Sequence, residues 1–377
     1  MNVLRRLPLN RLLALCALVV VLGISVTALA SALGSGPVPP AKPLAQAVHD
    51  ALSGPGGEQV QGISARIELT NHLLEGANLA SGGGSATGEL ASSPLLAGGS
   101  GRLWISKNGK MRIELQAEKG DTEILYDGHT LSLYDAANNT LYRYTPPAQT
   151  ASHVGTSTDP SATKHEVPSV AKIEEAISHL QQHANVSAAT PANVGGQPAY
   201  TVRVSPKETG SLLGGAELSF DANTGAPLRA AIYSSTSSAP VIELAATEIS
   251  YGPVSDSVFA FTPPTSAKIE EISSSSFQHH ASAKGSSKGA GQQKPTVTTH
   301  GHGLSSIAVL EEKTSTSAGK SEEGPLAGLP QVKINGANAS ELRTALGTVL
   351  SFERGGVRYV LAGSVAPGAI EELARGL

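Results

Sequence analysis

Short runs of alternating apolar and polar residues fill residues 101–147. One run alternates Leu103 and Ile105 with polar neighbours, and the next does the same from Met111 to Leu115. A period of two places every second side chain on the same face of a β-strand. The alternation therefore predicts a sheet with one apolar face, built from short strands.

Turn-forming pairs lie between these runs. They are Asn108-Gly109, Asp127-Gly128 and Asn138-Asn139. Such pairs between alternating runs favour tight hairpin turns, because Gly and Asn adopt left-handed backbone angles at low cost. We therefore expect consecutive strands here to pair antiparallel in a wide, curved sheet.

Further elements flank this segment on both sides. Two helices are expected, at residues 43–52 and at residues 168–183, the second with an apolar stripe at helical spacing. Alternation predicts more strands at 63–69, 200–204, 216–220, 228–233, 241–251 and 258–261. Residues 71–100 are rich in Gly, Ser and Ala and predict a long connection or flap.

The region after residue 267 is organised differently. Residues 273–300 contain almost no large apolar side chain, so they cannot bury enough surface to offset the entropy of ordering. Beyond them, a strand at 304–310, a hairpin at 349–361 and a helix at 367–377 predict a small α+β domain, with residues 314–324 as a loose insert. The predicted units are therefore an N-terminal anchor or signal with a short linker (1–40), a main domain (41–267), a flexible linker (268–303) and a C-terminal domain (304–377).

The N-terminus carries a membrane-directing signal. Arg5, Arg6 and Arg11 precede an apolar run at residues 12–33. A bilayer-spanning helix needs about 20 apolar residues, whereas the apolar part of a signal peptide has about 7–15. The length favours an uncleaved single-pass anchor with the bulk of the chain outside the cytoplasm. Cleavage after Ala30, which would give a secreted protein, is the alternative.

Composition excludes several classes of function. Charged residues make up 15% of the chain and the net charge is −4, so no basic footprint indicates a nucleic-acid partner. The one cysteine, Cys16, lies in the N-terminal apolar run. A disulfide framework or a cysteine metal site is therefore excluded.

The sequence contains several short matches to catalytic or metal-binding motifs, but none has the sequence context that such a site requires. The Gly-x-Ser-x-Gly match at residues 285–289 lies in the predicted linker, not on a strand-to-helix turn. His179 and His183 have helical metal-ligand spacing, but no third ligand is evident. The remaining histidine pairs, at residues 279–280 and 300–302, flank the linker. We therefore expect no catalytic residue, no metal and no cofactor, and a protein that is not an enzyme.

The order of several motifs resembles the LolA-like superfamily of lipoprotein carriers, the type that sorts outer-membrane lipoproteins. The motifs are Gly101-x-Leu103-Trp104-Ile105-x-Lys107, Asp127-Gly128-x-Thr130-Leu131 and Tyr134-Asp135. Residues 218–229 and 258–264 are similar to the later hairpin and last strand of that family. The family often has proline after the basic residue, where this chain has Asn108.

This resemblance implies a fold and a ligand. The fold is α+β, with an open, curved antiparallel sheet (a half-barrel) wrapped around helices and an apolar cavity for acyl chains. The second helix would then lie inside the curve. Residues 302–310 and 359–374 resemble the small C-terminal domain of the RseB/MucB group, whose members restrain an anti-sigma factor.

The candidate ligand-binding residues follow from the alternation. Six are expected to face inward and two to lie at the rim: Met111, Ile113, Leu115, Ile124, Leu131 and Leu133 inward, with Trp104 and Tyr142 at the rim. Trp104 has the opposite parity from its neighbours, so we expect it at an edge or under a flap. The alternative is an ordinary closed core, in which helices cover the whole face.

The leading hypothesis is an extracytoplasmic, membrane-tethered binding protein for lipid or for the acyl chains of lipoproteins. The alternative is an RseB/MucB-like regulator that binds an anti-sigma factor or another membrane partner protein. An enzyme acting on envelope polymers ranks third. Co-purified lipid would favour the first hypothesis, and a neighbouring anti-sigma-type protein the second.

Overall fold

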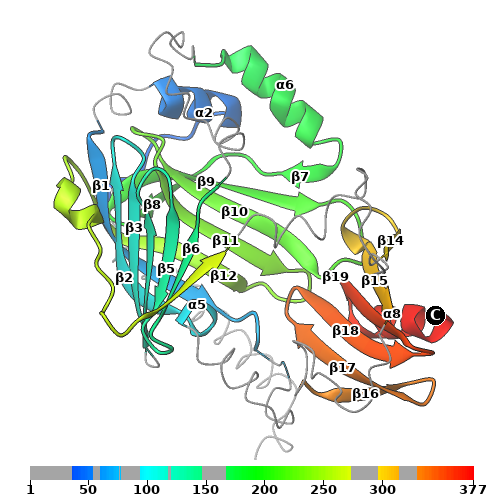
Figure 1. The fold of residues 1–377 in the computed structure, drawn as a ribbon. Helices are drawn as coiled ribbons and strands as arrows, with labels where there is room; N and C mark the ends of the chain where they lie inside the picture. The colour runs from blue at the N-terminus through cyan, green and yellow to red at the C-terminus, as the bar shows by residue number, and fades with distance from the viewer. Residues whose placement is uncertain are drawn as a thin grey trace, which may run out of the picture.

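Two antiparallel sheets organise the computed structural model. It describes residues 36–53, 60–75, 77, 94–117, 120–146, 167–272, 296–313 and 329–377. Sheet A holds the strands from β1 to β13, and sheet B holds β14 to β19 (Figure 1). Neither strand order returns to its start, so both sheets are open.

Sheet A is the larger unit. Its strands are β1 (Gly62–Asn71), β2 (Gly99–Ser106), β3 (Met111–Ala117), β4 (Gly120–Tyr126), β5 (Leu131–Asp135), β6 (Thr140–Tyr144), β7 (Ala184–Val186), β8 (Thr190–Val194), β9 (Gln197–Pro206), β10 (Leu213–Asp221), β11 (Pro227–Ser234), β12 (Pro240–Tyr251) and β13 (Lys268–Ile272). Their order is β13-β6-β5-β4-β3-β2-β1-β12-β11-β10-β9-β7, with β8 also on β9. The chain therefore folds as two meanders joined by the pairing of β1 with β12.

The three predicted hairpin turns are confirmed. Gly109, Gly128 and Asn139 have φ angles of 77°, 102° and 48°. Asp127 supports its turn further, because its carboxylate accepts hydrogen bonds from the backbone of His129 and Thr130 at 2.8 Å. These turns join β2 to β3, β4 to β5 and β5 to β6, and each strand from β2 to β6 pairs with the next.

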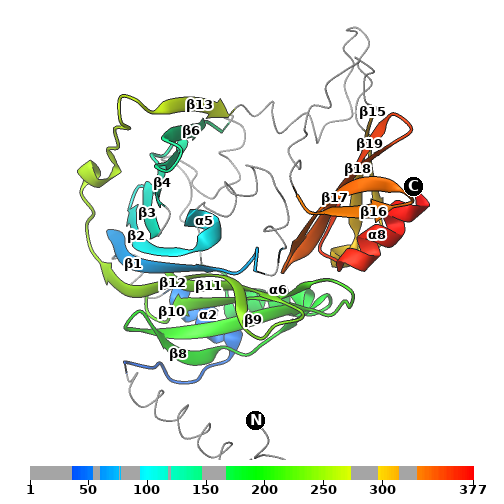
Figure 2. The ribbon, with the colours of Figure 1, turned by 90° about the horizontal axis from the view of Figure 1, so that it is seen from below.

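Strands β1 to β6 form a curved wall (Figure 2). A β-bulge lies between Arg66 and Ile67 where β1 meets β12, and bulges bend a strand and increase its twist. At Gly101 the backbones of β2 and β3 approach so closely that an added Cβ would lie 1.8 Å from the Glu114 carbonyl oxygen. The glycine therefore permits a close approach that no side chain would allow.

Three helices accompany sheet A. They are α2 (Leu44–Ser53), α5 (Pro94–Ala97) and α6 (Val170–Leu180). The four-residue α5 lies inside the curve of β1 to β6 (Figure 2). Helix α6 does not lie inside the curve as expected, because it packs mainly on α2 and meets the sheet at β7. Of its apolar stripe only Ile173 is buried, and Leu180 is 44% exposed, so the stripe packs on a neighbouring helix.

The chain between β12 and β13 crosses the outer face of sheet A. In the predicted strand at 258–261, the first two residues instead end a 3-10 helix, η3 (Asp256–Phe259), and residues 260–261 are in no strand. The last strand of the sheet is β13. The Arg112 guanidinium holds this crossing segment by donating to the Val258 carbonyl oxygen at 2.6 Å. Strand β13 then pairs parallel to β6. Residues 268–272, expected in the linker, therefore belong to sheet A.

Sheet B forms the C-terminal domain. Its elements are β14 (Thr296–His300), η4 (Gly303–Ser305), β15 (Ile307–Lys313), β16 (Gln331–Ile334), β17 (Ala337–Thr344), β18 (Gly347–Arg354), β19 (Val357–Gly363) and α8 (Pro367–Gly376). The predicted terminal helix is confirmed, with Ile370 and Ala374 fully buried against the sheet. The domain starts earlier than residue 304, because β14 pairs with β15.

Backbone hydrogen bonds connect the two parts of the chain. The Leu212 amide donates to the Ser364 carbonyl oxygen at 2.7 Å, and the Ala345 amide donates to the Leu73 carbonyl oxygen at 3.0 Å. The Leu304 amide also donates to the Glu208 carboxylate at 2.9 Å. The loop between β9 and β10 is therefore the main attachment point of the C-terminal domain.

Several predictions lie outside the described residues. They concern the N-terminal anchor or signal (1–35), most of the flap, the centre of the linker (273–295) and the insert at 314–324. Within the described ranges, no helix has the length and apolar character needed to cross a membrane.

Candidate functional site: the apolar face of sheet A

One face of sheet A carries apolar side chains across the whole sheet. Residues directly opposite in an antiparallel register point to the same face. From β2 to β5 one such row is Leu103, Ile113, Ile124 and Leu133, and it ends on β6 at Tyr142. The next row is Ile105, Met111, Tyr126, Leu131 and Tyr144. The expected set therefore shares one face, with the exception of Trp104.

The same face continues into the second meander. Leu69 of β1 lies opposite Leu244 of β12, which lies opposite Ala230 of β11. Ala230 in turn lies opposite Leu218 of β10, and Leu218 opposite Val202 of β9. From β9 across to β6, these apolar residues therefore point to the same face of the sheet. We call it the apolar face from here on.

Two helices cover parts of the apolar face. Ala47 and Ala51 of α2 pack on Tyr200 and Phe220, at the end of β9 and β10. Leu95 of α5 packs on the core cluster that also holds Ala65, Ile67 and Leu115. Leu115 is only 3% exposed, so it is a core residue rather than an accessible one.

Other parts of the face are exposed in the described part of the chain. Leu218 is 45% exposed and Leu131 is 39% exposed, and Ala216 and Ala230 are also exposed. Met111, Ile113, Ile124, Leu133 and Tyr142 are half-buried. Leu218 and Leu131 are thus large apolar side chains that remain exposed on the apolar face, and this exposure suits an apolar ligand.

Trp104 lies on the opposite face, as its parity predicted, and therefore apart from the other candidates. It is half-buried, and the Arg112 guanidinium carbon lies 6.0 Å from its ring centroid. Arg112 also pairs with Glu114 at 2.7 Å and Glu123 at 3.1 Å. Burial raises the pKa of the Glu123 carboxyl, against the opposing charge of Arg112. Trp104 therefore belongs to an outer-face cluster beside the crossing segment that Arg112 holds.

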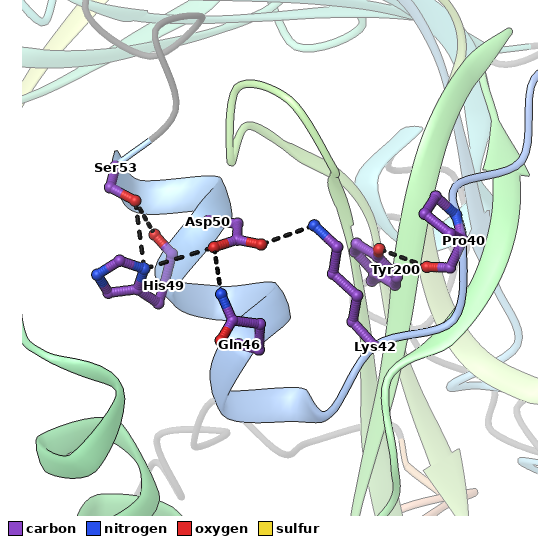
Figure 3. Close-up of polar contacts among 7 residues, drawn as sticks. All are labelled: Pro40, Lys42, Gln46, His49, Asp50, Ser53 and Tyr200. Carbon is purple, nitrogen blue, oxygen red and sulfur yellow. Dashed lines mark hydrogen bonds and ion pairs between the residues drawn. The ribbon is translucent and has the colours of Figure 1, made fainter.

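A polar cluster on α2 is the other candidate site, and Figure 3 shows its contacts. The Lys42 ammonium donates to the Asp50 carboxylate at 2.6 Å, and the Gln46 amide donates to it at 2.7 Å. The bond from Lys42 lowers the pKa of Asp50, and the same bond raises the pKa of Lys42. The Tyr200 hydroxyl donates to the Pro40 carbonyl oxygen at 2.7 Å, which ties the start of α2 to β9.

This cluster contains serine, histidine and aspartate without the geometry of a catalytic triad. The His49 Nδ1 atom lies 3.5 Å from Asp50 and 3.4 Å from the Ser53 hydroxyl. A triad needs the two partners on different ring nitrogens, so that a proton can pass between them. The Ser53 hydroxyl instead donates to the His49 carbonyl oxygen at 2.6 Å. The cluster therefore fastens α2 to the sheet and positions no nucleophile.

The histidine pairs do not assemble a metal site. Among the residues that the structure describes, no group of three or more His, Cys, Asp or Glu side chains is placed to hold a metal ion. His179 and His183 are both exposed, at the end of α6 and just beyond it. Within this part of the chain, the geometry supports binding through apolar contacts better than metal chemistry.

Sequence reasoning missed the half of the apolar face that β9 to β12 supply. Alternation at residues 216–220 predicted the strand but gave no sign that Leu218 would join the face of Leu133. That connection depends on β1 pairing with β12, which lie far apart in the sequence. What the sequence did show is that Leu218 and Val202 both stand at the apolar positions of alternating runs.

Residues 91–206 match a family model described as "Predicted periplasmic protein (DUF2092)". The DUF2092 match spans a minority of the chain and includes β2 to β9. No curated protein matches the sequence.

Solved structures of both kinds suspected from the sequence are among those similar to the chain. The crystal structure of MucB in complex with MucA(peri) has a TM-score of 0.41 and 14% identity, covering 88% of this chain and 94% of that chain. The Pseudomonas aeruginosa MucA/MucB complex has a TM-score of 0.40 and 13% identity, covering 88% and 94%. A LolA superfamily protein from Nitrosomonas europaea has a TM-score of 0.17 and 8% identity, covering 85% and 91%. At these values the similarity says nothing about ligand or partner.

Proposed function

We propose that this protein is an extracytoplasmic binding protein that holds the acyl chains of a lipid or a lipoprotein on its apolar face. The observation that carries the proposal is the exposure of Leu218 and Leu131 on a face that is otherwise apolar. Covering apolar surface stabilises a complex by about 25 cal/mol per Å². An acyl chain is flexible and wholly apolar, so it can follow a curved sheet.

The outer face of the sheet supports this assignment by contrast. It carries charged side chains in ion pairs, among them Arg229 with Glu217 and Glu243, and Arg112 with Glu123. A solvent-facing surface of this kind is normal for an antiparallel sheet with one buried face. In the described part of the chain, Leu218 and Leu131 are exposed on the inner face, and an apolar ligand would cover them. The apolar run at residues 12–33 would keep the protein at the membrane, close to such ligands.

A fluorescence titration with a conjugated fatty acid tests the proposal. The informative variant is Leu218→Asp, because a carboxylate at an open position disrupts an apolar contact without entering a closed core. Val297→Asp is the matched control, since Val297 is 54% exposed but lies in sheet B. We expect Leu218→Asp to weaken fatty acid binding roughly tenfold or more, and Val297→Asp to leave it unchanged. Equal binding by the wild type and Leu218→Asp would contradict the proposal.

A second candidate function is the binding of a partner protein through the C-terminal domain. Edge strand β14 favours it, because all five of its residues are exposed and it contains no proline or charged gatekeeper. Exposed edges of this kind accept an extended peptide as an additional strand. Under this function Val297→Lys would abolish capture of the partner, while fatty acid binding would not change.

A further inference from the structure

A polar depression lies on the outer face of sheet A, opposite the apolar face. It encloses about 470 Å³ and is lined by residues of β1, β2, β3 and β12. Its volume falls within the range of about 300–1,000 Å³ that small-molecule sites occupy. Neither the family match nor the acyl-binding proposal accounts for it.

The sequence of β2 explains the hollow. The strand begins Gly99-Ser100-Gly101, and Ser100 lies directly between Glu68 of β1 and Gln116 of β3. A small side chain between two long ones leaves a gap in an otherwise filled face. The bulge in β12 forms one wall, where the Thr247 hydroxyl donates to the Arg66 carbonyl oxygen at 3.4 Å.

The charges around the depression are arranged against the usual rule for sheets. Arg66 and Arg102 lie directly opposite each other, and like charges in that position destabilise a strand pair. Glu248 compensates Arg66 at 3.4 Å, and Arg112 engages Glu114 at 2.7 Å. On its other side Arg102 lies opposite Glu114 of β3, whose carboxylate pairs with Arg112 instead.

Three of the lining side chains are uncommitted. In the part of the chain that the structure describes, Arg102, Glu68 and Gln116 make no hydrogen bond or ion pair. Together they offer one guanidinium, one carboxylate and one amide around a common hollow. These groups are free to engage a ligand without breaking any existing contact.

We infer that this depression binds a small zwitterionic group that carries a primary ammonium and an oxyanion a few bonds apart. The Arg102 guanidinium suits the oxyanion, because its planar fork can donate two parallel hydrogen bonds. The Glu68 carboxylate suits the ammonium, and Gln116 can donate or accept between them. The ethanolamine phosphate headgroup of a lipid and a free amino acid or short peptide share this chemistry.

Titration calorimetry of the full chain tests the inference with O-phosphoethanolamine, glycylglycine and phosphatidylethanolamine vesicles as separate probes. We expect at least one probe to bind. Arg102→Gln and Glu68→Gln should each weaken that binding roughly tenfold, the usual effect of losing one hydrogen bond to a charged group. Arg354→Gln is the control, since Arg354 is an exposed arginine on sheet B.

The outcomes separate the sources of the ligand and the two proposals. Binding of vesicles together with O-phosphoethanolamine supports a lipid headgroup, whereas binding of glycylglycine alone supports a peptide. The absence of binding by all three probes overturns the inference, as does binding that Arg102→Gln and Glu68→Gln leave unchanged. Fatty acid titration of the same variants should match the wild type, so failure here does not affect the acyl-binding proposal.

Discussion

Leu69 in β1 lies directly opposite Leu244 in β12. This pair joins the two meanders of sheet A, because β1 also pairs with β2 and β12 with β11. The apolar positions of the two meanders consequently share one face, on which Leu218 and Leu131 remain open to solvent. The proposed acyl-binding surface depends on this single strand pairing.

The contact between β2 and β3 gives a first prediction. Gly101→Ala should destabilise sheet A by roughly 1–3 kcal/mol or more, because the new Cβ would meet the Glu114 carbonyl oxygen, which is backbone and cannot move aside. Gly368→Ala in α8 is the control, since nothing lies within 4 Å of its added Cβ. That change should be neutral or stabilise by up to about 1 kcal/mol. Urea unfolding of both variants measures the difference, and equal midpoints would refute the close approach.

The ion-pair network on β10, β11 and β12 gives a second prediction. Burial by itself would lower the pKa of Arg229, but hydrogen bonds to Glu243, Tyr233 and Glu217 outweigh it and raise the pKa. Arg229→Met should cost about 2–3 kcal/mol, because it leaves two largely buried carboxylates without a counter-ion.

Arg66→Met is the matched control for this network. The pair that Arg66 forms with Glu248 is exposed, with 67% and 70% of the two side chains accessible, so its loss should change stability by less than about 0.5 kcal/mol. Thermal unfolding of the two variants side by side gives the comparison. If Arg66→Met lowered the stability of the protein as much as Arg229→Met, burial would not decide the strength of these ion pairs.

Glu123 gives a prediction about pH. Burial raises the pKa of its carboxyl above the ordinary value of 4.5, so the folded protein binds this proton more tightly than the unfolded chain does. The contribution of Glu123 to stability is therefore most favourable below that value and declines as the pH rises through the raised pKa. The stability of the wild type relative to Glu123→Gln should accordingly decline as the pH rises from the ordinary pKa of the carboxyl through its raised pKa. The measurement is the melting temperature of both proteins at several pH values from about 4 upward, a range that starts near the ordinary carboxyl pKa of about 4.5. A difference in melting temperature between wild type and Glu123→Gln that does not change with pH would contradict the prediction.

Local sequence patterns predicted the strands β1 to β6 and their shared face. Hairpin pairing connects neighbours in the sequence, so alternation and the turns at Gly109 and Gly128 favour the register of β2 with β3 and of β4 with β5. The inward set from Met111 to Leu133 follows from that register. In this stretch, local preference and the final fold agree at every step.

Longer-range features could not be obtained in this way. The stripe on α6 predicts that one side of the helix packs, but it does not say that the partner is α2. The parallel addition of β13 to β6 depends on a segment that crosses the outer face of the sheet. Pairings of this kind depend on the path of the chain, which no local pattern records.

One missed element had a clear local signal. Strands β16 and β17 form a hairpin at Asn335-Gly336, with φ angles of 48° and 85°. This pair is typical of a two-residue hairpin turn. The weak alternation of the flanking strands obscured the signal, although Ile334 and Ala339 are both buried in the core of the C-terminal domain.

Mass spectrometry of organic extracts tests acyl binding most directly, with the full-length protein purified from the cells that produce it. If the apolar face holds acyl chains, the wild type should release acyl lipid or acylated peptide in amounts comparable to the protein. Leu218→Asp should release much less, and Val297→Asp as much as the wild type. An extract from the wild type with no bound acyl chain, or equal amounts from wild type and Leu218→Asp, would contradict the assignment of the apolar face as an acyl-binding surface.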